Sequence, residues 1–474
     1  MDQDVERHPS NGISVLVVGA GIAGAMSALE CWRRGCEVQI IEKQPGIDPA
    51  GDHFTIGPSA LRTFAHWPFL EAENERIAYE HLLGYHRQNG EPVLPPSKID
   101  IGSTTTKDGE VKPNRVYRHH RPRFAEMLLK QLNRIGISVQ YNHKVVEYYE
   151  NADTGKGGVK LEDGKTIEAD LVIAADGVGT KSHKLISGHE VRARSSGYAM
   201  YRMCFPIEHA MKDPLVVERW PYPANGPPSI FELWAGPDMS LYIWNTGDYF
   251  FWAMVHPDDG TAQESWHNFT PVEKVGAYIT EKGWPEITRR MVMATPSGKV
   301  IDWKLLWRDP QEKWYSPAGR VIQAGDSAHT FLPSSGNGGT QGVEDATSLA
   351  ACLELAGKDN IPLALKVHNK LRFERVACCQ RLGVSNQNAV TKTDWDAVKK
   401  NPKVLTNRHG QWIYHHNPEE YAVENFKACV DHILTGTPFE NTNKPPGYVH
   451  TPWVIEDLLD AQERGEDDVT GDWS

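Results

Sequence analysis

A loop of three glycines between a strand and a helix restricts the possible fold more than any other feature of the chain. The segment 14–18 is a continuous apolar run of strand length, and it leads directly into Gly19-Ala20-Gly21-Ile-Ala-Gly24. Helix-forming residues follow as far as Gly35, and a second strand-like run covers 38–42. This order predicts a βαβ unit, and therefore an α/β domain of the Rossmann type.

The same loop is suited to binding an adenine dinucleotide. Gly19 permits a tight turn, Gly21 allows a pyrophosphate to approach the backbone, and Gly24 allows the helix and strand to pack closely. The helix N-terminus adds free N–H donors and a positive dipole end. Glu42 ends the second strand, where a carboxylate can accept hydrogen bonds from a ribose. This motif alone does not distinguish NAD from FAD.

The composition excludes several classes of partner. The chain has 474 residues and a net charge of −12, and it has no long basic run, so we expect neither nucleic acid nor an anionic lipid surface as a partner. The longest nearly apolar stretch, 13–29, is too short for a membrane span, which needs about 20 residues. The acidic start has no apolar segment of a signal peptide, and the seven cysteines are widely spread, which indicates a cytoplasmic protein with reduced thiols.

The character of the sequence changes near residue 191. From there to 308, aromatic residues crowd short alternating segments separated by Pro and Gly, which predicts a mainly antiparallel sheet. We therefore predict a dinucleotide-binding domain in two parts, 12–190 and 309–390, with a substrate-binding domain at 191–308 inserted between them. The remainder, 391–474, forms a C-terminal extension.

A second motif favours FAD over NAD. Asp326 ends a strand-like run in Gly325-Asp326, and Pro333 and Gly336 follow before a predicted helix. The carboxylate can hold sugar or ribityl hydroxyls, and backbone without side chains can lie against a flat ring. An extended cofactor with two contact regions explains this segment, which a nicotinamide dinucleotide leaves unexplained.

With Asp176-Gly177 between them, these two motifs resemble those of the single-component FAD-dependent monooxygenases of the aromatic hydroxylase type. This group includes the p-hydroxybenzoate and salicylate hydroxylases, and the C-terminal part of the chain is similar to that of its fungal members. The resemblance implies a Rossmann-like FAD-binding domain of the GR2 type, an inserted mainly antiparallel substrate domain and a helical C-terminal region.

The resemblance also implies cofactor-binding residues. Gly19, Ala20, Gly21 and Gly24 would contact the pyrophosphate, Glu42 the ribose, and Asp326 the ribityl or pyrophosphate region. Beside the flavin ring would lie Pro333, Gly336, Gly338 and Gly339. Arg121 matches a family arginine, for which Arg123 is a competitor, and Asp176 and Gly177 would serve both FAD and transient NAD(P)H. Four sites depart from the family pattern: Phe124, Thr180, the pair His183-Lys184, and Thr340.

The implied reaction is hydroxylation of a phenolic or aromatic substrate, carboxylated or not, with or without loss of that carboxyl group. NAD(P)H would reduce FAD, and O2 would then form a flavin hydroperoxide that passes one oxygen atom to an electron-rich carbon. Epoxidation or indole oxidation in a natural-product pathway is the closest alternative. The glycine loop alone also allows an NAD-linked dehydrogenase, and the extension allows a non-catalytic flavin-bound redox or interaction protein. The sequence gives no oligomeric state.

Three residues are candidates for the reacting centre. His53 could be the base that turns a phenol toward phenolate, with Asp52 as a second base or an orienting partner. Arg202 could hold a carboxylate or phenolate. The alternatives are a solvent-facing loop histidine and a surface ion pair. Sheet aromatics could wall the cavity, although most are expected in the core: Trp234, Tyr242, Trp244, Phe251 and Trp252. No metal site is expected.

Overall fold

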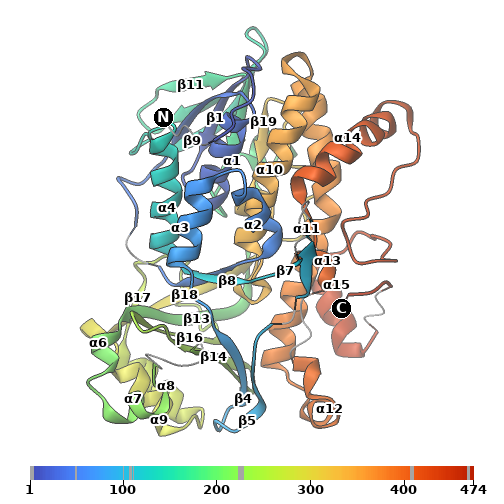
Figure 1. Ribbon diagram of the computed structural model, residues 1–474. Coiled ribbons are helices and arrows are strands. Elements are labelled where there is room, and N and C mark those ends of the chain that lie inside the picture. The colour runs from blue at the N-terminus through green and yellow to red at the C-terminus, as the bar shows by residue number, and fades with distance from the viewer. Residues whose placement is uncertain are drawn as a thin grey trace.

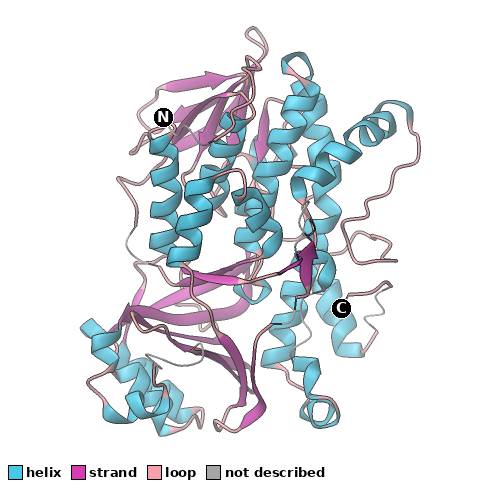
Figure 2. Ribbon diagram, viewed as in Figure 1, coloured by secondary structure: helices cyan, strands magenta, loops and turns pink. Residues whose placement is uncertain are grey.

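The computed structural model describes residues 5–48, 51–99, 101–105, 109, 111–222, 229–405, 410–466 and 470–473. A parallel sheet with its helices lies above a large second sheet, and long helices run along one side of both (Figure 1, Figure 2). None of the helices in these ranges is long and apolar enough to cross a membrane.

A four-stranded parallel sheet carries the glycine loop. Its order is β19-β12-β1-β2, with bounds β1 (Ser14–Val18), β2 (Glu37–Ile41), β12 (Leu171–Ala174) and β19 (Val321–Gln323). Helix α1 (Ile22–Arg33) connects β1 to β2, which confirms the predicted βαβ unit. Val15 and Val17 enter a core shared with helices, and Leu16 and Val18 enter a core on the opposite face. Because both faces are covered, the strand is apolar throughout.

Helices cover one face of this sheet, and a three-stranded antiparallel sheet covers the other. The helices include α1, α4 (Arg121–Arg134) and α10 (Gly338–Ala356), and the strands are β9 (Val145–Asn151), β10 (Lys156–Leu161) and β11 (Thr166–Ala169). Around them lie the shorter elements α2 (Pro58–Phe64), α3 (Pro68–Ile77), α5 (His183–Ser187), β6 (Ser103–Thr105) and β7 (Val111–Pro113).

The second sheet has eight strands in the order β17-β18-β13-β16-β15-β14-β4-β5. Their bounds are β4 (Leu82–Arg87), β5 (Pro92–Ser97), β13 (Arg194–Pro206), β14 (Ile230–Gly236), β15 (Met239–Asn245), β16 (Tyr249–Pro257), β17 (Phe269–Pro271) and β18 (Lys299–Trp307). All neighbouring pairs are antiparallel except β14–β4. The expected antiparallel sheet is therefore present, and it takes two additional strands from before the predicted range 191–308.

This large sheet has two different faces. One face packs on α6 (Ile207–Ala210), α7 (Pro214–Arg219), α8 (Val272–Glu281) and α9 (Glu286–Met293). The other faces the rest of the molecule. A two-stranded ribbon of β3 (His53–Ile56) and β8 (Tyr117–His120) lies between this face and helices α3 and α4 (Figure 1).

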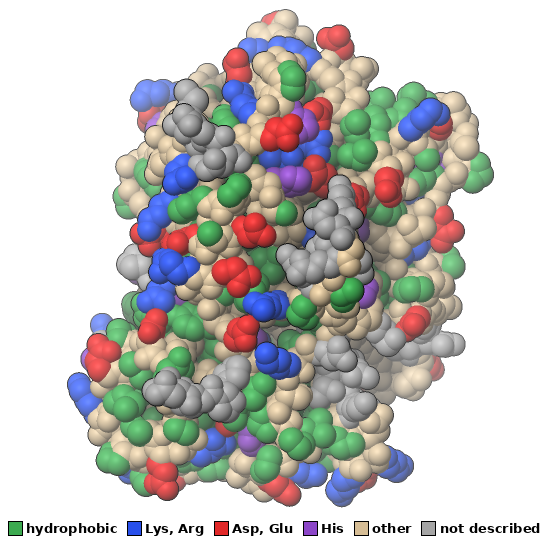
Figure 3. Space-filling model, in the orientation of Figure 1, with side chains coloured by type: hydrophobic (Ala, Val, Ile, Leu, Met, Phe, Trp, Pro, Cys, Tyr) green, Lys and Arg blue, Asp and Glu red, His purple; other side chains and the backbone are tan. Residues whose placement is uncertain are grey.

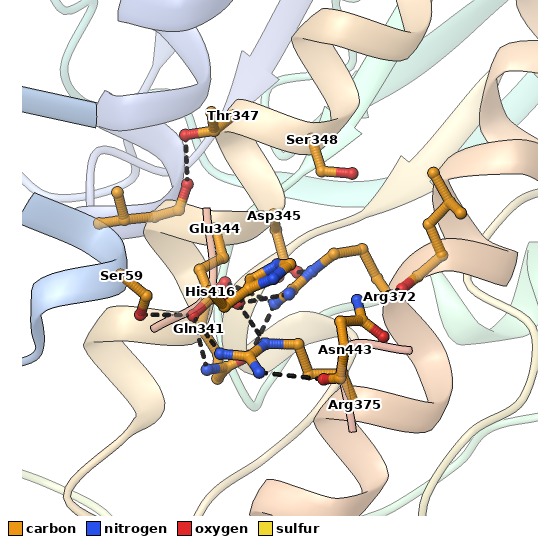
Figure 4. A network of polar contacts seen from close by, with 12 residues as sticks. Ser59, Gln341, Glu344, Asp345, Thr347, Ser348, Arg372, Arg375, His416 and Asn443 are labelled. Atoms are coloured by element: carbon orange, nitrogen blue, oxygen red, sulfur yellow. Dashed lines mark hydrogen bonds and ion pairs between the residues drawn. The ribbon is translucent and has the colours of Figure 1, made fainter. Parts of the chain in front are cut away.

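The C-terminal region is helical, as expected. It contains α11 (Ile361–Thr391), α12 (Trp395–Lys400), α13 (Gln411–Tyr414), α14 (Pro418–Thr435) and α15 (Ile455–Arg464). A buried ion network joins it to α10 (Figure 4). Arg375 donates through Nε to Glu344 at 2.8 Å and through its other nitrogens to the carbonyl oxygens of Trp412, Ile413 and Asn443 at 2.9–3.0 Å. One fully buried guanidinium therefore fixes two segments of the extension.

Candidate active site

The glycine loop is packed tightly on two sides and open on the third. Gly19 has φ +101°, and a Cβ there would lie 2.4 Å from the carbonyl oxygen of Ala175. A Cβ on Gly24 would lie 1.9 Å from the carbonyl oxygen of Gly19, whereas one on Gly21 would meet nothing within 4 Å. The backbone beside Gly21 is thus accessible at the N-terminus of α1, as a phosphate ligand requires.

Glu42 lies directly beside this loop. Its carboxylate accepts hydrogen bonds from the backbone N–H of Ala20 at 2.9 Å and of Gln44 at 2.8 Å. The side chain is only half-buried, so acceptor capacity remains for a ligand hydroxyl. This placement supports the ribose role predicted for Glu42.

The second motif meets the first at α1. A Cβ on Gly325 would lie 2.7 Å, and one on Gly342 3.1 Å, from the Cβ of Ala23. The adjacent Asp326 is exposed to solvent, yet burial raises the pKa of its carboxyl group. Arg121 is likewise exposed although burial lowers the pKa of its guanidinium. A side chain that is accessible to solvent and also surrounded by protein lines a hollow. Arg121 lies close enough to Asp326 to offset part of the rise in the pKa of that carboxyl group, so we infer that both side chains line one hollow.

The Asp-Gly element is tied to the second motif. Ser327 Oγ accepts from the N–H of Gly177 at 2.9 Å and donates to Asp176 Oδ1 at 3.2 Å. The N–H of Thr180 donates to the carbonyl oxygen of Gly177 at 3.1 Å, and burial raises the pKa of the Asp176 carboxyl group. Thr180 thus supports the Asp-Gly element from within the protein.

The segment beside the predicted ring position is rich in accessible backbone. Gly336 has φ +59°, which a side chain would strain, and α10 begins at Gly338 without a side-chain cap on its first N–H groups. Gly339 packs against Phe54, since a Cβ there would lie 3.2 Å from that ring. Thr340 Oγ1 accepts from the N–H of Gly57 at 2.9 Å, so this hydroxyl is used within the protein.

Together these loops fit FAD. Gly21 leaves open backbone at the start of α1, and Glu42 keeps acceptor capacity beside it. The second motif packs on the same helix, with the accessible carboxylate of Asp326 near Arg121. The competing candidate Arg123 points elsewhere, because it donates to Tyr79 Oη at 2.8 Å and to Asp248 at 2.9 Å.

Arg202 and Asp52 form a buried ion pair. The Arg202 Nη2 donates to Asp52 Oδ2, and the two side chains are 11% and 3% exposed. The guanidinium lies 4.8 Å from the ring centroid of Trp266 and 5.6 Å from that of Trp303. Burial lowers the pKa of Arg202 to about 10, so it stays charged at neutral pH. The alternative of a surface ion pair is therefore wrong.

The loop that carries Asp52 is held at the point where β8 passes into α4. The N–H of Arg121 donates to the carbonyl oxygen of Asp52 at 2.9 Å, immediately before β3 begins at His53. Residues 49–50 of the same loop lie outside the described part of the chain. The catalytic candidate Asp52 and the FAD-binding candidate Arg121 are thus held together by this hydrogen bond.

His53 is buried rather than solvent-facing. It is 7% exposed, its Nδ1 lies 3.7 Å from Cys204 Sγ, and its Nε2 has no hydrogen-bond partner among the described residues. Rings surround it, with centroids 5.0 Å away for Trp244 and 5.4 Å away for Tyr79. Burial, reinforced by His120 and Arg118, lowers its pKa well below the usual range. The imidazole is therefore neutral, with one free nitrogen.

The sheet aromatics divide between the two faces. Tyr242, Trp244 and Phe251 lie on the face toward β3 and β8. Trp234 and Trp252 lie in the core that packs on α7–α9, as a structural role requires. A groove of about 390 Å³ is lined in part by Tyr79, Arg123 and Asp248. Tyr79 also contacts Trp244, so the groove adjoins the aromatic face of the large sheet.

Four further residues of this region were not predicted from the sequence: Tyr79, His81, Arg118 and His120. Arg118 and His120 alternate along β8 and so share a face with each other. The signal was present in Tyr117-Arg-His-His-Arg121, a basic and imidazole-rich strand directly before a helix.

Four neutral histidines make the stability of this region depend on pH. Burial is the main cause that lowers the pKa of His119 to about 3 and of His120 to about 4, and it lowers those of His53 and His81 well below the usual range. In the unfolded chain these histidines take up protons near pH 6.5, whereas in the folded protein they stay neutral. Their contribution to the free energy of unfolding is therefore fully present above pH 6.5 and decreases below it. At pH 5.5 each of these histidines should lower the free energy of unfolding by about 1 kcal/mol relative to pH 7.5.

We therefore expect the free energy of unfolding, measured by urea denaturation, to fall between pH 7.5 and 5.5. His119→Gln should reduce the slope by one proton. A flat profile across this range would contradict neutral burial of these rings.

Comparisons with known proteins agree with this site. The model of a family described as FAD binding domain matches residues 12–360. The FAD-dependent monooxygenase fsr3 of Gibberella fujikuroi is 40% identical over 480 residues, which cover 100% of this chain and 92% of the relative.

Solved structures agree in fold. CtdE in complex with FAD and substrate 4 is 28% identical with a TM-score of 0.77, over 89% of this chain and 99% of CtdE. A salicylate hydroxylase substrate complex has a TM-score of 0.66 at 20% identity, over 87% of this chain and 97% of that one, and shows the fold alone. The expected resemblance and cofactor are confirmed, and FAD replaces the NAD-linked alternative. The chain belongs to the family with this FAD binding domain, and it is an FAD-dependent monooxygenase.

Proposed function

We propose that this monooxygenase hydroxylates a phenolic or aromatic substrate, with NAD(P)H as reductant and O2 as oxidant. The buried Arg202–Asp52 pair carries this proposal, because it lies where the FAD-side loop meets the aromatic face of the large sheet. FAD, when bound, would supply the transfer of electrons from NAD(P)H and the activation of oxygen.

The residues of the chain would prepare the substrate for attack. The Nε2 of His53 has no hydrogen-bond partner among the described residues but is sealed from solvent; once the surrounding rings make room, it would accept a hydrogen bond from a phenolic hydroxyl and so increase electron density in the ring. Arg202, oriented by Asp52, can stabilise negative charge that develops on the substrate during oxygen transfer. Trp244, Phe251 and Tyr242 would exclude water from the cavity.

The proposal is tested by incubating the FAD-loaded protein with NADPH or NADH, O2 and a panel of hydroxylated aromatic acids and their amides. We expect at least one compound to accelerate NAD(P)H oxidation and to gain one oxygen atom by mass. NAD(P)H oxidation that no aromatic compound changes would contradict it.

Arg202→Met should lower product formation by about 100-fold, the scale seen when one charge-stabilising donor is lost. FAD content should not change, because Arg202 lies on β13 and not on the FAD loops. Arg202→Lys should recover part of the product yield per NAD(P)H consumed. A wild-type yield in Arg202→Met would exclude the assigned role.

We further propose a cytoplasmic location. All seven cysteines are free thiols, as is usual for proteins of reducing compartments. Acidic and basic side chains are interspersed on the face in Figure 3, without a large patch of one sign.

A further inference from the structure

Arg118 is a cation without a counterion in the aromatic part of the site. Its guanidinium lies over the ring of Phe231, with Cζ 3.7 Å from the centroid, and its Nε donates to His81 Nε2 at 3.2 Å. No carboxylate among the described residues forms an ion pair with it. The groups that favour its charged form are the phenols of Tyr85 and Tyr242, and burial lowers its pKa to about 10.

His81 cannot supply the missing charge. Its Nε2 accepts the hydrogen bond from Arg118, so that nitrogen carries no proton. Burial and the neighbouring Arg118 lower the pKa of this imidazole well below the usual range, and it stays neutral. The interaction therefore fixes the position of Arg118 but leaves its positive charge uncompensated, which costs free energy in a protein interior.

The two terminal nitrogens of Arg118 remain available. They make no hydrogen bond to a described residue, and they are not among the sealed polar atoms of the interior. The side chain as a whole is half-buried. With one face on Phe231 and Nε on His81, the guanidinium presents its outer edge, which can form two parallel hydrogen bonds.

Arg118 and His53 lie near the same indole, that of Trp244, through His81 and Phe231. The indole of Trp244 contacts both imidazoles, with centroid distances of 5.4 Å to His81 and 5.0 Å to His53. Phe231 lies 5.9 Å from the same indole. Trp244 therefore links His81, the partner of Arg118, to the imidazole of His53.

The two buried arginines differ in what they can bind. The charge of Arg202 is already balanced by Asp52, whereas that of Arg118 is not. We propose that Arg118 binds an acidic group of the substrate, consisting of two coplanar oxygens that share one negative charge. A carboxylate and an ionised phenol beside a carbonyl group both have this chemistry. This inference rests on the proposed function and assigns anion binding to Arg118 rather than to Arg202.

The test measures binding to the FAD-loaded protein through the change in the visible spectrum of FAD. The probes are 1-hydroxy-2-naphthoate and 1-hydroxy-2-naphthamide. We expect the acid to bind about 10- to 100-fold more tightly at pH 7, and Arg118→Met to abolish this preference without weakening the amide. Arg118→Lys should recover part of it, and Arg115→Met, at an exposed arginine three residues earlier in the chain, should behave as wild type.

A second titration separates the two sources of charge. If the bound group is an ionised phenol beside a carbonyl, the amide should bind more tightly as its hydroxyl ionises at higher pH, and only while Arg118 is present. If it is a carboxylate, the preference for the acid at pH 7 should be independent of that ionisation. Probe binding that does not depend on Arg118 in either titration would overturn the proposal.

Stability provides an independent readout. Removing a cation that lacks a counterion should raise the thermal midpoint of the ligand-free holoprotein, so Arg118→Met should be more stable and yet lose anion binding. A lower midpoint with an unchanged preference for the acid would show a structural role and overturn the proposal. If anion binding depends on Arg118 but no aromatic compound is hydroxylated, the anion site stands and the proposed function fails.

Discussion

Replacing Glu344 by glutamine should lower the free energy of unfolding by about 3–5 kcal/mol, because it leaves a buried cation without its counterion. Glu344 and Arg375 are both fully buried, and no other carboxylate of the described residues pairs with Arg375. The neighbouring arginines hold the pKa of Glu344 far below its usual range, so the carboxylate is ionised in the folded protein. Urea denaturation of the FAD-loaded variant and wild type measures the loss.

The network in Figure 4 predicts where this loss should appear first. Arg375 holds the carbonyl oxygens of Trp412, Ile413 and Asn443, so limited proteolysis should cut the C-terminal extension of Glu344→Gln before the rest of the chain. The double variant Glu344→Gln/Arg375→Met should recover part of the stability, because it removes the unpaired cation.

An exposed pair provides the control for this experiment. Glu190 and Arg192 are paired at the surface, with side chains 57% and 84% exposed. Glu190→Gln should leave the denaturation midpoint unchanged, since exposed pairs contribute little. Equal midpoints for Glu344→Gln and wild type would contradict a stabilising role of the network.

Local sequence patterns predicted the parts of the site that depend on backbone shape. The glycine loop, the Gly325-Asp326 turn and the position of Glu42 are each set by a few consecutive residues, and the structure brings all three together at α1. An aromatic-rich run was enough to predict the antiparallel sheet. These features depend on short-range rules, which a single sequence contains.

The remaining features depend on contacts between distant segments. Asp52 and Arg202 were both candidates, but they are 150 positions apart, and nothing in the sequence shows that the fold brings them into one ion pair. Arg118 was not predicted because basic strand residues are usually exposed, and His81 was not because it precedes β4 and meets Arg118 only in the folded chain. The two strands β4 and β5 join the large sheet through a parallel pairing with β14, which alternation alone does not reveal.

The glycine loop allows the packing of the protein and the approach of FAD to be tested separately. A Cβ on Gly24 would lie 1.9 Å from the carbonyl oxygen of Gly19, so Gly24→Ala must displace the loop. We expect the dissociation constant for FAD to rise by about 100-fold or more, the equivalent of about 3 kcal/mol of overpacking. The apoprotein should also unfold at lower urea.

Gly21→Ala is the matched variant. Its φ of −70° suits any residue, and a Cβ there meets no protein atom within 4 Å, so the apoprotein should keep wild-type stability. The added methyl group occupies only the space through which a pyrophosphate approaches the helix, and FAD binding alone should weaken. Glu42→Ala, which removes one acceptor near the ribose, should weaken FAD by about 10-fold. Isothermal titration of apoproteins with FAD measures all three, and unchanged binding in Gly21→Ala would place the pyrophosphate elsewhere.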